Sequence, residues 1–426
     1  MVEYATRTLN MTGVWWIPDS YENRMMGTLT RKPNRGCELK LVDDSFDFNW
    51  DMSAGIIVGL NSDQKPITLI DCKYAGHAGT TGSGNVHSFG HWIQSKCALV
   101  GYLFENDSDL EIIDLYLGYA GLDEYVMEKY HTYDMTKDID GNYHIEEVTF
   151  DIPKYEIARI GVTGVELYVS FSLDKELRLR HKLHLSFSAG NSYRSEGDDL
   201  RLIDVILPEF LGTLMGHHSF ITALTSRIGN APVEIFDGYN RKMSWNGDPD
   251  FLGRLVWGSK DRLDLWPFIL PAWAKNYEAV AKLCRAYIKI LADGNDGFLE
   301  INNLVHIFFG LEAYYKAKCK RKRGSLAKAL NYAICQIRSR FQNVEKYIAA
   351  VESIDMNSLS HARQVLVHAN EGDPDYALVY HQLIFITRCV LLMEMEYPVS
   401  AVEKDTSHWE LWHFLADRRK RKEANS

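Results

Sequence analysis

The sequence predicts an α+β protein, with a β-rich N-terminal domain that is sandwich-like or barrel-like and an all-α C-terminal bundle. Short runs that alternate apolar and polar residues recur between positions 12 and 190, which is the period of half-buried strands. After position 270 the apolar residues recur at three- and four-residue steps, which is the period of helices. Because 426 residues exceed one compact core, we expect one domain over residues 1–265 and a second over residues 271–426.

The N-terminal domain is expected to consist of short strands separated by turns. Pro33-Asn34-Arg35-Gly36 is a tight-turn sequence between two of these strands. Leu183, Leu185 and Phe187 alternate with polar neighbours, as expected for a strand with one buried face. The expected strands cover residues 25–30, 37–42, 56–60, 67–72, 96–104, 111–117, 144–150, 164–171, 177–187, 220–228 and 233–236.

Five helices are expected in the C-terminal domain, after an aromatic connector at residues 257–273. The first helix begins near Val280, and the second carries the apolar stripe of residues 301–311. The third is the most regular, because apolar residues recur at helical steps from Leu326 to Ile348, with Ser325 as its N-cap. Helices of this kind with short loops form a bundle.

The last two expected helices flank a short loop. The fourth covers residues 359–368, and the fifth covers residues 375–396, with Asp373 as N-cap and Pro374 at the first helical position. The stretch at 378–395 is the most apolar in the chain, but it contains polar and charged residues that would be costly at a bilayer centre. We therefore expect a buried helix and no membrane association.

The cysteines and the N-terminal segment indicate a cytoplasmic protein. Seven cysteines lie far apart in the sequence, without a CxxC pair for zinc or the dense spacing of a disulfide framework. The first residues lack the positively charged lead and apolar run of a secretory signal. We expect neither a metal ion nor a cofactor, since no spacing of zinc-site or phosphate-loop type occurs.

Charge is divided unevenly between the two expected domains. Residues 271–426 hold 22 Lys and Arg against 18 Asp and Glu, a net charge of +4, whereas the remaining residues carry −14. A total of −10 argues against a general coat for nucleic acid. A basic domain on an acidic body can still attract a phosphate backbone locally, because clusters of charge matter more than the sum.

Arg363 and His368, near the end of the fourth helix, are the candidate catalytic residues because this segment of the chain resembles HEPN ribonucleases. Cleaving RNA without a metal requires a proton acceptor or donor near neutral pH, a task that suits His. It also requires a cation for the charge that builds on the phosphoryl oxygens, and the planar fork of Arg presents several donors to phosphate. On an ideal helix the two residues lie about 140° apart. We therefore expect the helix to end between them, where Ala369-Asn370-Glu371-Gly372 follows.

The segment Arg363-Gln364-Val365-Leu366-Val367-His368 resembles the motif of HEPN ribonucleases. Those proteins carry Arg, a polar residue, three further residues and His at the end of one helix, before the last long helix of the bundle. It is the only match of this spacing in the chain. The resemblance implies catalytic roles for Arg363 and His368 and a supporting role for Gln364, where many members have Asn, Asp or His.

The N-terminal half resembles that of ApeA-type HEPN proteins, which are prokaryotic anti-phage effectors. The resemblance lies in Gly13-Val14-Trp15-Trp16-Ile17-Pro18, Gly27-Thr28-Leu29 and Glu38-Leu39-Lys40-Leu41. It implies a metal-independent endoribonuclease that acts in abortive infection and leaves a 2′,3′-cyclic phosphate. RNA is then the substrate, and a phage-derived trigger or inhibitor protein is an implied partner of the N-terminal domain.

Further residues are expected to assist. Glu312 falls on the core-facing stripe of the second helix, so its carboxylate should need a partner. It either orients Arg363, or has a structural role in which it pairs with Arg388 or lies at a partly exposed edge of the bundle. Asn370 follows the motif and is a second supporting candidate. The run Lys320, Arg321, Lys322 and Arg323 is a candidate for holding the RNA backbone, with a solvated helix end as the alternative.

The expected assembly is a homodimer. The fifth helix carries apolar residues so far around its circumference, among them Leu391 and Leu392, that one bundle should not cover them all. The alternative is that they pack under the N-terminal domain. Two other functions stay open: a non-catalytic bundle that binds a nucleotide or a partner protein, and a sugar- or peptide-binding β-domain whose bundle only dimerises. In the first, Arg363 holds a phosphate without cleavage. A structural role also stays open, with Arg363 in a surface ion pair and His368 at the C-terminal end of its helix.

Overall fold

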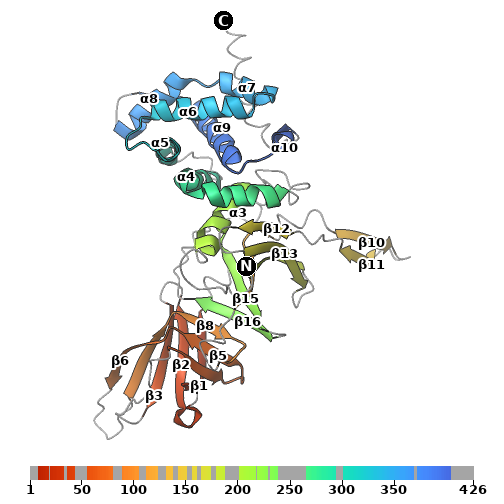
Figure 1. Ribbon diagram of the computed structural model, residues 1–426, viewed down its shortest axis with the longest axis vertical. Helices are drawn as coiled ribbons and strands as arrows, with labels where there is room; N and C mark the ends of the chain where they lie inside the picture. The colour runs from red at the N-terminus through yellow and green to blue at the C-terminus, as the bar shows by residue number, and fades with distance from the viewer. Residues whose placement is uncertain are drawn as a thin grey trace. The chain divides into compact units, whose positions relative to one another are not determined.

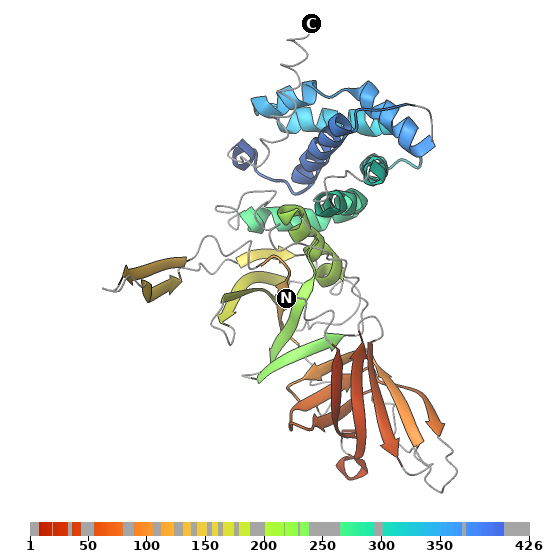
Figure 2. The same ribbon diagram turned by 180° about the vertical axis from the view of Figure 1, so that it is seen from behind.

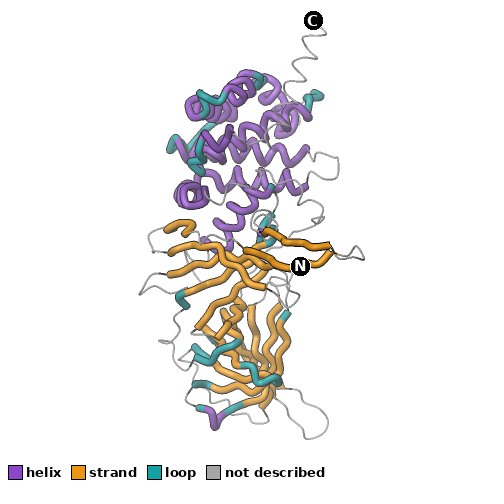
Figure 3. Tube along the Cα trace, turned by 90° about the vertical axis from the view of Figure 1, so that its right-hand side faces the viewer, coloured by secondary structure: helices purple, strands orange, loops and turns teal. Residues whose placement is uncertain are grey.

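The structure is a computed structural model. It describes residues 8–18, 20–32, 36–43, 55–79, 89–104, 112–122, 131–137, 143–150, 156–160, 165–173, 179–187, 201–216, 218–228, 231–237, 265–293, 301–368 and 372–403. Strands dominate the first part of the chain and helices the second, which confirms the predicted α+β class (Figure 3).

The chain forms two compact units that alternate along the sequence. The first unit contains residues 1–120, 163–204 and 220–244, and the second contains residues 121–162, 205–219 and 245–426. The boundary predicted between residues 265 and 271 stays a prediction. The second unit combines the helical bundle with segments from the middle of the chain.

The first unit is built on a continuous antiparallel sheet (Figures 1 and 2). Its strands follow the order β13-β14-β9-β15-β16-β8-β5-β4-β1-β2-β3-β7-β6. A 3₁₀ turn, η1 (Tyr21–Asn23), lies between β1 and β2. The strand bounds are β1 (Leu9–Trp16), β2 (Met25–Lys32), β3 (Gly36–Asp43), β4 (Ile57–Asn61), β5 (Pro66–Ile70), β6 (Lys73–Gly79), β7 (Phe89–Ser95), β8 (Cys97–Val100), β9 (Asp114–Tyr119), β13 (Val165–Leu173), β14 (Leu179–Phe187), β15 (Ile221–Ile228) and β16 (Ala231–Asp237).

Trp15 on β1 anchors the core of this unit. Its ring is fully buried, and its indole Nε1 donates to the backbone oxygen of Gly27 on β2 at 3.2 Å. Across the β1–β4 pair, a Cβ at Gly59 would lie 2.4 Å from the Trp15 ring. The glycine therefore makes room for the ring, since real side chains do not approach so closely.

The helices of the second unit surround one central helix. A π-helical turn, η4 (Leu202–Ile206), leads into α3 (Leu207–Met215), and the bundle follows after residue 265. Two strands, β10 (His131–Lys137) and β11 (Tyr143–Phe150), form a hairpin, and β12 (Glu156–Ile160) lies against α4. The bundle consists of α4 (Trp266–Asp293), α5 (Ile301–Lys318), α6 (Leu326–Arg340), α7 (Glu345–Glu352), α8 (Met356–His368), α9 (Tyr376–Glu394) and α10 (Val399–Glu403).

Helix α9 lies at the centre of the bundle, in contact with α4, α5, α6 and α8 (Figure 1). Ile384, Leu391 and Leu392 are at most 2% exposed within the single chain. The expectation that one bundle cannot cover this helix is therefore wrong. The apolar surface of α9 does not support a homodimer. α9 is long and apolar enough to cross a membrane, but 67% of its apolar window is buried, as in the core helix of a bundle.

Two of the predicted helices differ from the structure in their bounds. α4 begins at Trp266, so residues 266–273 are helix and not connector, although Pro271 lies inside it. Trp266 and Trp273 are both fully buried, and this packing offsets the hydrogen bond that the proline removes. The expected third helix is two helices, α6 and α7, because the chain turns between Phe341 and Val344 while the apolar spacing continues across the turn.

The N-cap of α9 is Asp375 and not Asp373. The Asp375 carboxylate accepts a hydrogen bond from the backbone N–H of Leu378 at 3.0 Å, which satisfies one unpaired donor of the first turn. The cap of α6 lies where the sequence predicts it, at Ser325, but its hydroxyl makes no capping hydrogen bond.

Candidate functional site

The expected site residues Arg363, His368 and Glu312 meet where α8 packs on α5. Arg363 Nη2 donates to Glu312 Oε1 at 2.9 Å, and its Nη1 lies 3.2 Å from His368 Nε2. The Glu312 side chain is 10% exposed and that of Arg363 is 23% exposed, whereas His368 lies at the surface. The guanidinium thus bridges a nearly buried carboxylate and a solvent-facing imidazole.

α8 is continuous from Met356 to His368, so no break separates Arg363 from His368. The expectation that the helix must end between them is wrong. The arginine side chain is long enough to cover the 140° between the two positions, whereas that angle describes only where each side chain leaves the backbone. Both groups therefore face one point on an unbroken helix.

The contact between Arg363 and His368 is compatible with one form of the imidazole. A guanidinium has only donors, so Nε2 can accept from it only in the neutral tautomer that carries its proton on Nδ1. A protonated ring would present two donors to a cation, and the contact would break. In this arrangement His368 is prepared to accept a proton.

Glu312 pairs with Arg363 and not with Arg388. The Arg388 Nε instead donates to the Tyr287 hydroxyl at 2.6 Å, with the guanidinium 5.9 Å from the centre of the Tyr287 ring. Burial raises the pKa of Tyr287 to about 12, so this hydroxyl is neutral at physiological pH. Among the alternatives that the sequence left open for Glu312, the structure therefore shows the ion pair with Arg363.

Of the two other residues predicted to support the site, only one is described by the structure. Gln364 is exposed on α8, and Asn370 lies outside the described residues. The chain after residue 371 passes close to His361, because a Cβ at Gly372 would lie 2.8 Å from the His361 ring. His361 precedes His368 by about two helical turns and shares its side of α8, so it is a candidate that the motif did not indicate.

The basic run lies beyond the C-terminus of α5. Lys320, Arg321, Lys322 and Arg323 are all exposed. Lys320 has a positive φ of 50°, and the Arg321 backbone N–H donates to the Lys316 carbonyl at 3.0 Å, which closes the helix end. Their exposure permits contact with a phosphate backbone, but no hydrogen bond connects them to Arg363 or His368.

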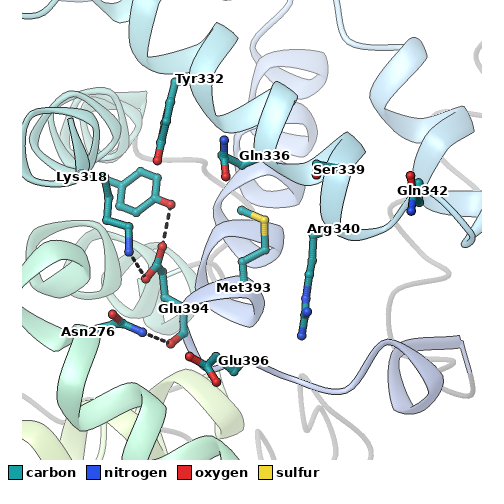
Figure 4. A pocket seen from close by; sticks show the side chains of 11 residues that line it. Asn276, Lys318, Tyr332, Gln336, Ser339, Arg340, Gln342, Met393, Glu394 and Glu396 are labelled. Atoms are coloured by element: carbon teal, nitrogen blue, oxygen red, sulfur yellow. Dashed lines mark hydrogen bonds and ion pairs between the residues drawn. The ribbon is translucent and has the colours of Figure 1, made fainter.

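A polar cavity of about 760 Å³ lies elsewhere in the bundle, between α5, α6 and α9 (Figure 4). Glu394 of α9 lies within it, and its carboxylate accepts from the Tyr314 hydroxyl at 2.8 Å and from Lys318 Nζ at 2.7 Å. Burial and the neighbouring Glu394 raise the pKa of Tyr314 far above its ordinary value. The sequence showed no sign of this cavity, because its walls come from helices far apart in the chain.

Within the part of the chain that the structure describes, no three His, Cys, Asp or Glu side chains are grouped to hold a metal ion. The carboxylate nearest to the candidate site, Glu312, is already paired with Arg363.

Comparison with known proteins places the N-terminal part of the chain in a family context. Residues 10–196 match the family model of ApeA N-terminal domain 1, which indicates the N-terminal domain of an ApeA-like defence protein. The matched segment does not reach Arg363 or His368. No curated protein and no solved structure matches the chain.

Proposed function

We propose that the chain is an anti-phage endoribonuclease in which Arg363 and His368 cleave RNA without a metal ion. The observation that carries the proposal is the contact of 3.2 Å between Arg363 Nη1 and His368 Nε2, with Glu312 holding the other side of the guanidinium. The match to an ApeA N-terminal domain supports the role in defence. The bundle is then the HEPN effector, and the N-terminal half senses an infection cue or restrains the nuclease.

The chemistry is a transesterification. The neutral imidazole of His368 takes the proton of a ribose 2′-hydroxyl, and the 2′-oxygen attacks the adjacent phosphorus. As the bond from phosphorus to the 5′-oxygen breaks, the leaving oxygen takes a proton from an imidazolium or from water. The products are a 2′,3′-cyclic phosphate and a 5′-hydroxyl, with no net oxidation or reduction.

Arg363 stabilises the negative charge that develops on the phosphoryl oxygens. Its guanidinium is held by Glu312, so it is oriented before the RNA binds. When His368 becomes protonated in the reaction, its contact with Nη1 breaks, and that donor turns to the phosphate. Glu312 is a positioning residue in this scheme, since it contacts Arg363 and not the reacting atoms.

The proposal includes a homodimer whose contact surface is on α5 and not on α9. Phe309 of α5 is 47% exposed, and it precedes Glu312 by three residues, so the two lie on neighbouring positions of the same helix side. An exposed aromatic ring beside the candidate site supports a contact there with a second copy, whose His368 would protonate the leaving oxygen.

The proposal is tested with the full chain and a labelled RNA in the presence of EDTA. Cleavage should persist, should yield 2′,3′-cyclic phosphate ends, and should be lost in His368→Ala. The matched control is His306→Ala, which removes an exposed imidazole from α5. Cleavage that disappears on chelation and returns with Mg²⁺ contradicts the mechanism. Binding of RNA without any cleavage by the activated protein favours a non-catalytic module.

A further inference from the structure

The polar cavity between α5, α6 and α9 has the walls of a binding site. Its volume of about 760 Å³ falls within the range of pockets that hold small organic ligands. Figure 4 shows side chains from all three helices around it, with Tyr332 and Arg340 on α6 and Glu394 on α9. Neither Arg363 nor His368 lines it.

A nearly buried carboxylate faces this cavity. The Glu394 side chain is only 7% exposed, and it is held in place by Tyr314 and Lys318. Asn276 of α4 fixes the backbone at the same residue by donating to its carbonyl oxygen at 2.9 Å. Each carboxylate oxygen has two lone pairs and uses one of them here, so the group can accept further hydrogen bonds from a ligand. The ligand should therefore present N–H or O–H donors.

A cation lies at the other end of the cavity. Arg340, in the last turn of α6, donates from one terminal nitrogen to the Tyr397 carbonyl at 3.2 Å. A guanidinium has five donors, so several remain for an anion such as a phosphate. Between these ends the Tyr332 hydroxyl, the Gln336 amide and the Ser339 hydroxyl line the cavity, and none of them has a hydrogen-bond partner among the described residues.

A ribonucleotide has hydrogen-bond donors and an anionic group that could bind to the carboxylate and the arginine of this cavity. It carries base N–H donors for a carboxylate and a phosphate for an arginine. Guanine is the base whose pairing edge has two adjacent N–H donors, which the two oxygens of one carboxylate can accept together. Lys318 at the cavity and Glu312 at the candidate site both belong to α5, six residues or about 9 Å apart along the helix axis.

We propose that this cavity binds the base and phosphate of a guanine ribonucleotide, with Glu394 accepting from the base and Arg340 donating to the phosphate. The inference rests on the proposed ribonuclease function for its biological meaning, because a guanine bound here would select where RNA is cut. The same chemistry would take a free guanine nucleotide that regulates the bundle.

The binding test uses the full chain and calorimetric titration with the four ribonucleoside monophosphates. GMP should bind about tenfold or more tightly than AMP, CMP or UMP. Arg340→Gln should weaken GMP binding by about tenfold, because it removes the charge that faces the phosphate. Arg338→Gln, an exposed arginine on the same helix turn, is the matched control and should leave binding unchanged. Glu394→Gln should reduce the preference for GMP, and Gln336→Ala on the surface provides a second variant if the buried substitution prevents folding.

The source of the nucleotide is tested with His368→Ala protein, which cannot cut its ligand under the proposed mechanism. Tighter binding of a short RNA with a single G than of the same RNA with A identifies a base of the substrate, whereas preference confined to free GMP identifies a regulatory ligand. Absence of GMP binding, or GMP binding that Arg340→Gln does not change, overturns the inference. If GMP binds as expected but no RNA is ever cleaved, the proposed function fails and the nucleotide site stands.

Discussion

Arg363 and His368 are in contact at 3.2 Å although they stand five residues apart on one unbroken helix. The guanidinium is a donor only, so the contact is made by the neutral form of His368, which is also the form that can accept a proton. Glu312, which comes from another helix, completes a chain of three polar groups that ends at the surface.

Arg363→Lys should lower the rate of RNA cleavage by about 10²-fold. The lysine keeps the charge, but a single ammonium group cannot contact Glu312, His368 and a phosphate at once as the planar fork does. The measurement is the initial rate on a labelled RNA, with Arg338→Lys as the control for an exposed arginine. A rate within about twofold of the wild type would show that charge alone suffices.

Glu312→Gln should lower the cleavage rate by about tenfold and leave RNA affinity nearly unchanged. The amide oxygen can still accept from Arg363, but it holds the guanidinium more weakly than a carboxylate does. Measuring the catalytic rate and the RNA dissociation constant separately distinguishes this positioning effect from loss of binding. Glu352→Gln, an exposed glutamate on α7, is the control. If the affinity for RNA falls as much as the cleavage rate, Glu312 contributes to substrate binding and not to the positioning of Arg363.

Phe309→Glu should prevent self-association without unfolding the chain, because the ring is 47% exposed. Leu391→Glu, at a fully buried position, should unfold the bundle instead, because it places a charge in the core of α9. Sedimentation velocity reports the association state, and thermal unfolding reports the stability of each variant. A Phe309→Glu protein that remains dimeric and active would remove this surface from the proposal.

The free energy of unfolding should depend on pH through Glu209. This glutamate of α3 accepts from Arg285 Nε at 2.6 Å and from the Tyr277 hydroxyl at 2.8 Å, and burial raises its pKa above the ordinary value of 4.5. A raised pKa in the folded state means that the neutral carboxyl contributes stability below the ordinary pKa, which is lost as the pH rises through the raised value. The melting temperature of Glu209→Gln minus that of the wild type should therefore increase as the pH rises from acidic to neutral. A difference that stays constant with pH, or that favours the wild type as the pH rises, would contradict the direction of the shift.

Gly310→Ala should destabilise the bundle by about 1–3 kcal/mol. A Cβ at Gly310 would lie 2.8 Å from the Cα of Leu283, so α5 would have to move away from α4. Since α5 also carries Glu312, we expect the cleavage rate to fall as well. Chemical unfolding measures the free energy, with Ala317→Ser as an exposed control on the same helix. Wild-type stability would show that the two helices separate easily.

The local patterns of the sequence are sufficient for much of this description. The change from a two-residue to a helical period identifies many of the strands and the helical bundle, because each period reflects which side chains share a face. It misses β1, β6 and β7 of the first unit, although Trp15 of β1 is fully buried in the core of that unit. The Arg363 and His368 pair is also visible as a spacing, since both residues belong to one helix. The turn between α6 and α7 escapes the same reasoning, because Phe341 and Val344 are both buried and keep the apolar pattern intact across it.

Contacts between distant segments were decided by the tertiary structure alone. The sequence by itself determined that Glu312 needed a partner, but the choice of Arg363 over Arg388 depends on how α8 lies against α5, 51 residues away along the chain. Four helices likewise pack around α9 and bury it within one chain. Its apolar composition had predicted that a second copy of the chain would cover part of it. The polar cavity exists only because Lys318, Arg340 and Glu394 converge from three helices. Periodicity reports the burial of one helix face, and it holds no information about which other helix covers that face.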